Sequence, residues 1–462
     1  MRKKLPRFES LLWLFVNTTL YVGLLLMYLG FFGRYYIALT RPSRTLGITI
    51  VAFLVALFLF IRIYGRYDVG RRKSKPIIHS FVFSMFFADI VTYLEHMIMR
   101  TNTGIQDFAF QHIETLVVVY VAQLILVVIY TYAGNALFFR IHPPERVCIV
   151  TNSQASLDKV ASVICKFKKQ YHIEKVIDYR DIDLLKKIKK METVFFYNVP
   201  WRYREQLVEF CYRNRINIYF NPEIADVVEM SSEYYVLDDL SFLNANVKTL
   251  TMNQRIMKRL LDIGLSLAML ICSSPIWLVA TIAIKAYDGG SVFFKQDRMT
   301  INGTIFQVYK FRTMKEHVEN RSVSEGDSRI TKPGAILRKT RMDELPQLIN
   351  ILKGDMTFVG PRPEMIENIE DYERELPEFR YRMKVKAGLT GYAQISGKYN
   401  TSPKDKLIMD LVYIEQFSIW KDIQLIFQTF LVLLKSDSTE AFSDKKQTPY
   451  VFEKYVEDKP LK

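Results

Sequence analysis

Four apolar stretches in the first third of the chain constrain its fold more than any other feature. They cover residues 10–32, 46–63, 77–99 and 113–139. Each is close to the ~20 residues that an α-helix needs to cross the hydrocarbon core of a bilayer. The first stretch is too long for the apolar core of a signal peptide, and no small-residue cleavage site follows it. The sequence therefore predicts a bundle of four uncleaved transmembrane helices over residues 1–144.

Basic residues flank these stretches unevenly. The densest basic segments are "MRKKLPR" before the first stretch, "RYDVGRRKSKP" between the second and third, and "RIHPPER" after the fourth. Short loops rich in Lys and Arg stay on the cytoplasmic side of a membrane. Both ends of the bundle are therefore expected in the cytoplasm, together with the chain that follows it.

The overall charge indicates an anionic partner. The 462 residues include 63 Lys and Arg against 48 Asp and Glu, a formal net charge of +15. Such a balance suits nucleic acid, a phospholipid surface or a phosphorylated substrate. The four cysteines are far apart and the six histidines do not cluster. Neither a disulfide framework nor a Cys/His metal centre is therefore expected.

Three polar residues interrupt the third apolar stretch. Glu95 and His96 lie close to its end, and we expect them in the membrane interface. Asp89 lies deeper, where an ionisable residue can mark a functional polar site. The sequence alone does not decide between such a site and a structural role for Asp89.

Residues 145–250 have the texture of a small α/β domain. Short runs such as "RVCIVTN", "KVIDY", "TVFFYNV" and "NIYF" alternate with segments of helical periodicity. That alternation predicts a Rossmann-like domain, in which helices cover both faces of a parallel sheet. The turn after the first strand, "TNSQASL", contains no glycine, so the glycine fingerprint of a dinucleotide site is missing. A structural or regulatory role is therefore favoured over nucleotide binding.

A fifth apolar segment covers residues 259–287. Ser273, Ser274 and Pro275 lie at its centre, and basic residues flank both of its ends. Proline removes a backbone donor and favours a kink, and nearby serines can satisfy the carbonyl groups that a kink frees. We therefore expect a helix–break–helix hairpin that enters and leaves the same leaflet. The alternative is a kinked span, which would carry the rest of the chain across the membrane.

The segment "KTRMDELPQLINILKGDMTFVGPRP" (339–363) concentrates acids, arginines and rigid turns. We expect Asp343 to be a helix N-cap, ionised by the helix dipole and by Arg338 and Arg341. An ionised aspartate can attack phosphorus, and Glu344 beside it can hold a divalent metal. The stiff "PRP" would present Arg362 to a phosphate group. The alternative is an ordinary capping residue surrounded by surface ion pairs.

Three motifs in this part of the chain point to a family. "YKFRTM", "RMDELPQLINILKGDMTFVGPRP" and "KAGLTGYAQISGK" resemble the bacterial sugar transferases, the monotopic phosphoglycosyl transferases. The resemblance covers about residues 253–435, and the preceding spans and α/β domain resemble the large form of the family. Ser274-Pro275 matches the break in the family's re-entrant membrane helix. The third motif departs from the usual pattern at Ala387 and Tyr392, where relatives carry Pro and Trp.

The resemblance implies a multi-pass protein of the bacterial inner membrane. Its expected parts are the helical bundle, the Rossmann-like domain, a mixed α/β catalytic domain with a re-entrant helix (251–440) and a polar tail (441–462). The catalytic domain would lie on the cytoplasmic face. It would transfer a sugar 1-phosphate from a UDP-sugar to undecaprenyl phosphate, the initiating step of surface polysaccharide synthesis.

The resemblance also implies roles for individual residues. Asp343 would attack the phosphate attached to the sugar, which releases UMP and leaves a covalent sugar-phosphate enzyme. Glu344 would be catalytic and a Mg²⁺ ligand. Substrate binding is assigned to Lys310, Arg312, Arg338, Arg341, Arg362, Lys386 and Gln394.

Two other functions are weighed against this one. A catalytically inactive membrane scaffold or sensor is disfavoured by the intact set of acids and arginines. A nucleotide-sugar-modifying enzyme based on the middle domain is disfavoured by its missing glycines. No nucleic acid partner is expected, and the large middle domain is consistent with a homodimer. The sequence leaves glucose, galactose and N-acetylated hexoses open as the transferred sugar and favours a plain hexose.

Overall fold

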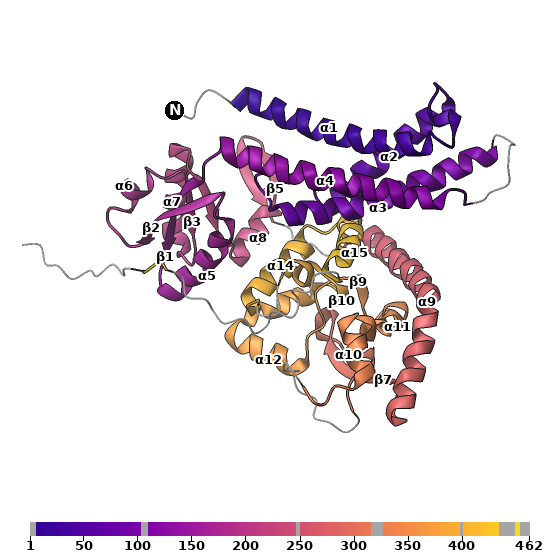
Figure 1. Cartoon of the computed structure of the whole chain (residues 1–462). Coiled ribbons are helices and arrows are strands. Elements are labelled where there is room, and N and C mark those ends of the chain that lie inside the picture. The colour runs from indigo at the N-terminus through magenta and orange to yellow at the C-terminus, as the bar shows by residue number, and fades with distance from the viewer. Residues whose placement is uncertain are drawn as a thin grey trace, which may run out of the picture. The chain divides into compact units, whose positions relative to one another are not determined.

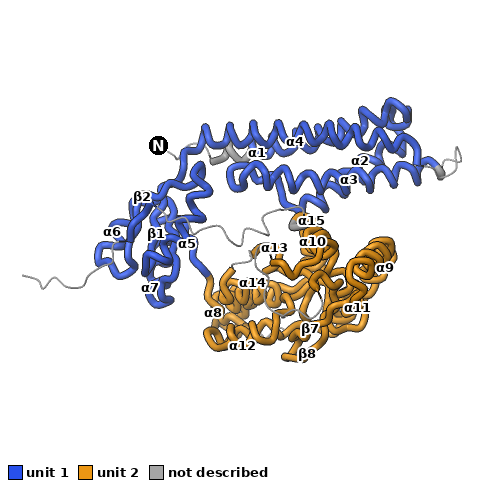
Figure 2. Tube along the Cα trace, turned by 60° about the horizontal axis from the view of Figure 1, so that its bottom comes forward, with its two compact units in different colours: residues 1–221, 444–462 blue, residues 222–443 orange. Residues whose placement is uncertain are grey.

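The computed structural model describes residues 6–102, 110–245, 250–315, 327–397, 401–433 and 449–452. The chain forms two compact units, which Figure 2 distinguishes by colour. Unit 1 comprises residues 1–221 together with 444–462, and unit 2 comprises residues 222–443. The chain thus leaves unit 1, builds unit 2 and then returns to unit 1.

The first part of unit 1 consists of the predicted long helices (Figure 1). They are α1 (Pro6–Phe32), α2 (Arg44–Tyr64), α3 (Ser74–Asn102) and α4 (Ile113–Ile141). Among the described residues, these four and one helix of unit 2 are long and apolar enough to cross a membrane. The prediction of four apolar N-terminal helices is confirmed, and the protein is a membrane protein.

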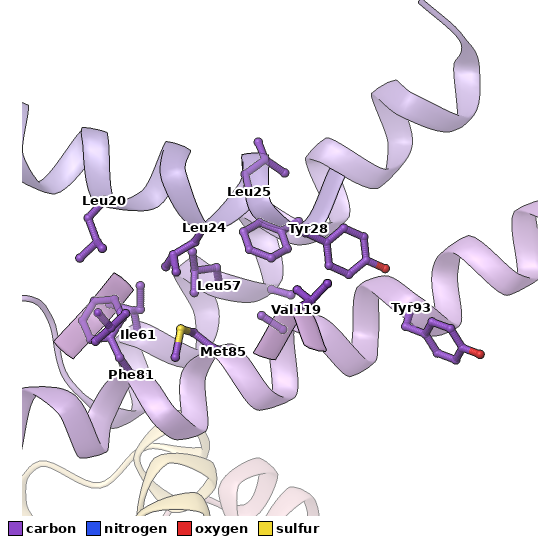
Figure 3. Close-up of a cluster of buried hydrophobic side chains, with 14 of the residues drawn as sticks. Leu20, Leu24, Leu25, Tyr28, Leu57, Ile61, Phe81, Met85, Tyr93 and Val119 are labelled. Carbon is purple, nitrogen blue, oxygen red and sulfur yellow. The ribbon is translucent and has the colours of Figure 1, made fainter. Parts of the chain in front are cut away.

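The interior of the bundle is built from side chains of all four helices (Figure 3). Leu24 and Tyr28 of α1 are completely buried and meet residues from the other helices, which include Leu57, Ile61, Phe81, Met85 and Val119. Many apolar side chains on the opposite helix faces stay exposed, such as Val51, Phe58 and Ile125. A bundle that is apolar outside as well as inside is suited to lipid rather than water.

Asp89 lies inside this bundle and links three of its helices. The side-chain amide of Gln123 on α4 donates to Asp89 Oδ1 at 3.2 Å and to the Leu24 carbonyl of α1 at 3.1 Å. Hydrogen bonds between membrane helices help to set their packing, so this geometry supports a structural role for Asp89. His96 is also buried, with its ring 4.7 Å from that of Tyr36.

The second part of unit 1 is a parallel α/β domain, as the sequence predicted. Its strands β1 (Glu145–Thr151), β2 (Tyr171–Asp178), β3 (Thr193–Phe196) and β4 (Asn217–Phe220) pair in parallel in the order β2-β1-β3-β4. The helices between them are α5 (Gln154–Ile164), α6 (Leu184–Ile188) and α7 (Trp201–Asn214).

Helices cover both faces of this sheet. Val147 and Ile149 of β1 pack in the same core cluster as Leu157 of α5. Cys148 and Val150 alternate with them and belong to a second cluster, together with residues of α6 and α7. The central strand is therefore buried on both sides, as expected for a parallel sheet.

A short segment from the far end of the chain completes the α5 side of this domain. The Gln154 side chain accepts from the Phe452 amide at 2.7 Å and donates to the Tyr450 carbonyl at 3.1 Å. Both aromatic side chains pack against the cluster beneath α5. Of the predicted polar tail, 441–462, only residues 449–452 are described, and these contact the middle domain.

Unit 2 begins with α8 (Ile224–Met230), followed by a hairpin of β5 (Glu233–Leu237) and β6 (Leu240–Asn244). The sequence analysis grouped this segment with the middle domain. In the structure Val227 of α8 is buried in the main core of unit 2. The division between the two compact units therefore falls before α8.

The fifth apolar segment forms one continuous helix, α9 (Met252–Asp288), with Pro275 inside it. The two expected halves are therefore assigned as a single helix, and Pro275 lies inside it rather than in a gap between two helices. Proline removes only one backbone donor from a helix of this length, and the Ser274 hydroxyl donates to the Ile271 carbonyl at 2.8 Å. The helix begins with a capping box at Thr251 and ends at Gly289, whose φ of 71° suits glycine.

Both halves of α9 pack on unit 2. In the first half, Lys258 and Asp262 are buried, and the Asp262 carboxylate accepts from the Phe358 amide at 2.9 Å. In the second half, Ala280 and Ile284 share a core cluster with Phe311 and Leu337. Side chains between these two contacts remain exposed, including Ile271 and Leu278.

Short elements build the rest of unit 2 around a single main core. The antiparallel strands β7 (Phe293–Met299) and β8 (Ile305–Phe311) are joined by a turn at "INGT". They are followed by α10 (Lys332–Lys339), η4 (Met342–Glu344), α11 (Gln347–Lys353), β9 (Thr357–Val359), α12 (Ile366–Glu375), η5 (Pro377–Lys384), β10 (Gly388–Thr390), α13 (Tyr392–Ser396), α14 (Pro403–Glu415) and α15 (Ile419–Leu433). Strands β9 and β10 pair in parallel. Leu348, Phe358 and Leu407 are among the buried core residues.

Candidate active site

A polar pocket of about 270 Å³, counted with its opening to solvent, lies in unit 2. Its walls come from β7, β8, the turn η4, the loop after β9, and the region of β10 and α13. They are formed by Arg298, Val308, Lys310, Glu344, Gln347, Arg362, Pro363, Gly388, Leu389 and Gln394. Four of the residues that the resemblance assigns to the site, Lys310, Glu344, Arg362 and Gln394, are therefore brought together here.

The β7–β8 hairpin supplies two of the cations. In its register Arg298 lies opposite Phe306, and Phe294 lies opposite Lys310. Side chains alternate between the two faces of a strand, so Arg298 and Lys310 project from the same face. Lys310 Nζ reaches Glu344 Oε1 at 3.2 Å.

The acidic pair lies in η4, a single 3₁₀ turn. Arg341 precedes it with a φ of 58°, and Glu344 N donates to the Arg341 carbonyl at 3.4 Å. The sequence analysis predicted Asp343 as the N-cap of the next helix, and this prediction is wrong. That position belongs to Pro346, because α11 begins only at Gln347.

Glu344 is held in its ionised form. Burial alone would raise the pKa of Glu344, but the charges of Lys310, Arg362 and Arg341 outweigh burial and lower it to about 2. Besides Lys310, the Arg362 guanidinium lies 3.8 Å from the same carboxylate oxygen. A fixed negative charge therefore lies at the wall of the pocket at neutral pH.

The pKa of Asp343 is shifted in the opposite direction. Burial and the negative charge of Glu344 raise the pKa of Asp343 above its ordinary value, although Lys310, Arg338 and Arg341 act to lower it. The sequence analysis counted these arginines but not the loss of water around the carboxyl group. Burial therefore reverses the direction of the pKa shift of Asp343 that the arginines alone would give.

The loop that carries Arg362 is held by hydrogen bonds from several elements. The Val359 carbonyl accepts from Lys258 Nζ at 2.8 Å and from the Tyr413 hydroxyl at 3.0 Å. Gly360 N donates to the Thr390 carbonyl, and Gly388 N donates to the Pro361 carbonyl, both at 2.9 Å. A Cβ on Gly388 would lie 2.1 Å from Gly360 N. Glycine is therefore required for the loop and β10 to approach this closely.

Several residues that the sequence analysis assigned to the site or to the helix break lie outside the pocket wall. The Arg312 guanidinium binds Asp288 at 2.8 Å and the Ser291 carbonyl at 2.6 Å. Lys386 Nζ donates to the Gly354 carbonyl at 2.6 Å. Arg338 Nε donates to Thr313 Oγ1 at 2.8 Å. Arg341 is exposed, and both it and Arg338 act on Asp343 through charge. Ser274 and Pro275 are exposed on α9.

The sequence analysis did not predict Arg298 or Gln347 as residues of the site. A signal for Arg298 was present, because the "INGT" turn sets the register that places it on the face of Lys310. Gln347 gave no such signal, since its place in the wall depends on where α11 begins.

The acidic pair fits a magnesium site that substrate would complete. Among the described residues, no group of three or more His, Cys, Asp or Glu side chains could hold a metal by itself. Mg²⁺ is usually bound by one or two carboxylates together with substrate phosphates and water. The ionised Glu344, next to Asp343, offers that donor set.

Comparison with known proteins places this pocket in a family. The model of the family described as bacterial sugar transferase matches residues 253–436, a range that includes every residue of the pocket wall. A UDP-glucose:undecaprenyl-phosphate glucose-1-phosphate transferase of Caulobacter vibrioides is 35% identical over 189 residues, which are 39% of this chain and 71% of that protein. The chain belongs to the bacterial sugar transferase family.

Two other bacterial sugar transferase relatives match the same half of the chain. A UDP-N-acetylgalactosamine-undecaprenyl-phosphate N-acetylgalactosaminephosphotransferase of Aeromonas hydrophila is 37% identical over 183 residues, 38% of this chain and 43% of that protein. A UDP-glucose:undecaprenyl-phosphate glucose-1-phosphate transferase of Escherichia coli K12 is 39% identical over 183 residues, 38% of this chain and 39% of that protein. The chain thus aligns with less than half the length of each of these two relatives.

Proposed function

We propose that this protein transfers a sugar 1-phosphate from a UDP-sugar to undecaprenyl phosphate, giving undecaprenyl-diphosphate-sugar and UMP. The observation that carries the proposal is a half-buried aspartate, Asp343, beside a pocket of positive charge. Arg298, Lys310 and Arg362 contribute three positive charges to the wall and Glu344 one negative charge, which leaves two. That excess suits the two phosphate groups of a nucleotide-diphosphate donor.

The names of the relatives support the same reaction class. The Aeromonas and Escherichia coli proteins are named for transfer to undecaprenyl phosphate from different UDP-sugars. Because the named sugars differ among relatives of similar identity, the sugar used by this protein is not proposed. The product would begin the synthesis of a bacterial surface polysaccharide.

In the first step, an Asp343 carboxylate oxygen attacks the phosphorus bonded to the sugar. A new P–O bond forms, the bond to the bridging oxygen of the diphosphate breaks, and UMP leaves with that electron pair. Burial of Asp343 removes water from the nucleophile before the donor arrives. Lys310 and Arg362 would offset the charge that develops on the phosphate oxygens.

In the second step, a phosphate oxygen of undecaprenyl phosphate attacks the phosphorus of the aspartyl sugar-phosphate. The bond to Asp343 breaks and its carboxylate is restored. A covalent intermediate lets a water-soluble donor and a lipid acceptor use one site in turn. Glu344, which is ionised at neutral pH, would hold Mg²⁺. Bound Mg²⁺ supplies charge neutralisation on the phosphate oxygens.

We also propose that α9 bends at Pro275, so that it enters and leaves one leaflet, with the pocket on the cytoplasmic face where UDP-sugars are found. The support is that both halves of α9 pack on the same compact unit, through Asp262 in one half and Ile284 in the other. A helix that crossed the bilayer would place these two contacts on opposite sides of the membrane. The exposed apolar side chains between them, such as Ile271 and Leu278, would contact lipid.

The test is to trap the covalent intermediate. Purified protein is incubated with a UDP-sugar that carries a label on the phosphate next to the sugar, without undecaprenyl phosphate, and then digested for mass spectrometry. We expect a sugar-phosphate adduct on the peptide that contains Asp343, its loss on addition of undecaprenyl phosphate, and no adduct in Asp343→Asn. A wild-type protein that turns over the donor without an adduct would refute the covalent step. No turnover of any UDP-sugar would favour the scaffold alternative.

A further inference from the structure

The Arg298 side chain is a cation of the pocket to which the resemblance assigns no role. It lines the pocket beside Lys310, Glu344 and Arg362. Its position is fixed by the β7–β8 register and by an antiparallel bridge between Arg298 and Met365. Arg298 is therefore held between the hairpin and the segment that directly follows the "PRP" sequence.

The hydrogen bonds of Arg298 leave part of its guanidinium available. One terminal nitrogen donates to the Pro363 carbonyl at 3.3 Å and the other to Gln296 Oε1 at 2.5 Å. A guanidinium has five N–H donors, and within the described part of the chain no further acceptor takes a bond from it. The bond to Pro363 also ties Arg298 to the element that presents Arg362.

The charge of Arg298 lacks a close counterion. No carboxylate of the described residues lies within ion-pair distance of it. Burial, and then the like charge of Arg362, lower the pKa of Arg298 to about 10, although the more distant Glu364, Glu367 and Glu344 act to raise it. Arg298 is therefore protonated at neutral pH. Its charge is balanced only at a distance, which leaves its guanidinium available for a bound anion.

We propose that Arg298 is a substrate-binding residue that, with Lys310 and Arg362, binds the two phosphate groups of the nucleotide-diphosphate donor. The inference rests on the proposed function and adds a residue to it. The shared face of Arg298 and Lys310 puts two cations on one wall, and the Pro363 bond puts Arg362 on the next. A planar guanidinium can bind phosphate oxygens through two parallel hydrogen bonds.

The inference predicts different effects on binding and on stability. In Arg298→Gln we expect the KM for the donor to rise roughly tenfold to a hundredfold, the range for loss of a charged hydrogen bond. The melting temperature of the substrate-free protein should change little, because the repulsion from Arg362 and the attractions to Glu364, Glu367 and Glu344 are removed together. Inorganic diphosphate should raise the melting temperature of the wild type but not of Arg298→Gln.

Two further variants keep the test decisive. Lys295→Gln removes the same charge from the same strand, but Lys295 pairs with Tyr309 on the opposite face and is exposed, so we expect wild-type KM and diphosphate response. Arg298→Lys keeps the charge, should fold if Arg298→Gln does not, and should recover only part of the affinity.

A purely structural role would give a different set of results. Arg298→Gln would then melt at a lower temperature, yet keep the KM and the diphosphate response of Lys295→Gln, and the inference would be overturned. Failure of the proposed function is seen separately, since wild-type protein would then form no adduct on Asp343. If the wild-type adduct forms and Arg298→Gln binds donor normally, only the role of Arg298 is refuted.

Discussion

Two neighbouring carboxyl groups, Asp343 and Glu344, are driven to opposite protonation behaviour by their surroundings. For Glu344 the nearby cations outweigh burial and lower the pKa to about 2. For Asp343, burial and the charge of Glu344 outweigh the cations and raise the pKa. Neighbouring acids with separated pKa values commonly have separate tasks. In this site the separation suits a permanent metal ligand beside a nucleophile poorly solvated by water.

The raised pKa of Asp343 predicts that removing the charge of Arg338 shifts the pH dependence of activity. Arg338 lowers the pKa of Asp343, so Arg338→Gln should raise it further. If Asp343 is the proposed nucleophile, only its ionised carboxylate can attack, so activity should rise as pH increases through this pKa. The acid limb of the kcat/KM profile of Arg338→Gln should then lie at higher pH than that of the wild type.

The control for this prediction is Lys339→Gln, which removes a charge from the next, exposed residue. Lys339 is not among the charges that shift the pKa of Asp343. The acid limb of the kcat/KM profile of Lys339→Gln should therefore match that of the wild type. An acid limb of Arg338→Gln that stays in place, or moves to lower pH, would show that Arg338 does not act on the nucleophile.

At the scale of elements, α9 is joined by a hydrogen bond to the loop that carries Arg362. Lys258 Nζ contacts Asp422 Oδ2 at 2.5 Å and the Val359 carbonyl at 2.8 Å, and the Tyr413 hydroxyl donates to Asp422 Oδ1 at 2.8 Å. Lys258 and Asp422 are both buried. Residues of α9, α14 and α15 thus meet at the carbonyl group directly before the "GPRP" turn.

Breaking this buried pair should be costly. Lys258→Met leaves the Asp422 carboxylate without a counterion, and we expect the free energy of unfolding to fall by about 3–5 kcal/mol. Denaturant unfolding in detergent micelles would measure it. Lys258→Met combined with Asp422→Leu removes both charges and should recover part of the loss. If the double variant is less stable than the sum of the two single changes, the pair is not the source of the effect.

The membrane path of α9 can be tested from its two ends. Single cysteines are placed at Thr251 and Asn302, which flank the helix, in a background without the native cysteines. Neither should react with a membrane-impermeant thiol reagent in intact cells, and both should react once the cells are opened. A cysteine at Tyr35, between α1 and α2, is the control and should label from outside. Labelling at Asn302 but not at Thr251 in intact cells would mean that α9 crosses.

Elements with long periodic patterns were predictable, and features set by tertiary contacts were not. The apolar stretches and the alternating runs of the middle domain gave α1–α4 and the parallel sheet, because burial period and length suffice to identify them. Asp343 was misassigned as an N-cap, because Pro346 and the left-handed Arg341 together place a separate turn before α11. Pro275 does not interrupt the helix assignment of α9, since one missing donor does not end a long helix. Arg312 and Lys386 resembled substrate ligands in sequence, but their nearest acceptors are Asp288 and the Gly354 carbonyl.

At the scale of the whole molecule, the middle domain is completed by residues from beyond unit 2. Gln154 of α5 binds the backbone at Tyr450 and Phe452, and these aromatic side chains cover the cluster that contains Leu157. Unit 2 is therefore inserted, in the order of the sequence, between two parts of unit 1.

This returning segment predicts a local loss of protection. Phe452→Ala should speed amide hydrogen exchange in α5 and β1, because part of their apolar cover is removed. Exchange in the core of unit 2, for example around Leu348 and Phe358, should not change. Hydrogen-exchange mass spectrometry of the full chain would measure both. Unchanged exchange in α5 would show that the segment does not hold the domain together.

The return of the chain to α5 also sets an order of events during translation. The strands and helices of the middle domain leave the ribosome before any of unit 2, whereas Tyr450 and Phe452 are made only after it. A nascent chain that stops before residue 449 therefore has an uncovered apolar surface beside α5, which is the kind of surface that chaperones and proteases bind. The apolar surface beside α5 can therefore be buried only after the ribosome has synthesised the whole of unit 2. A gene fusion that exchanges the catalytic unit with that of a relative would have to keep this short segment as well.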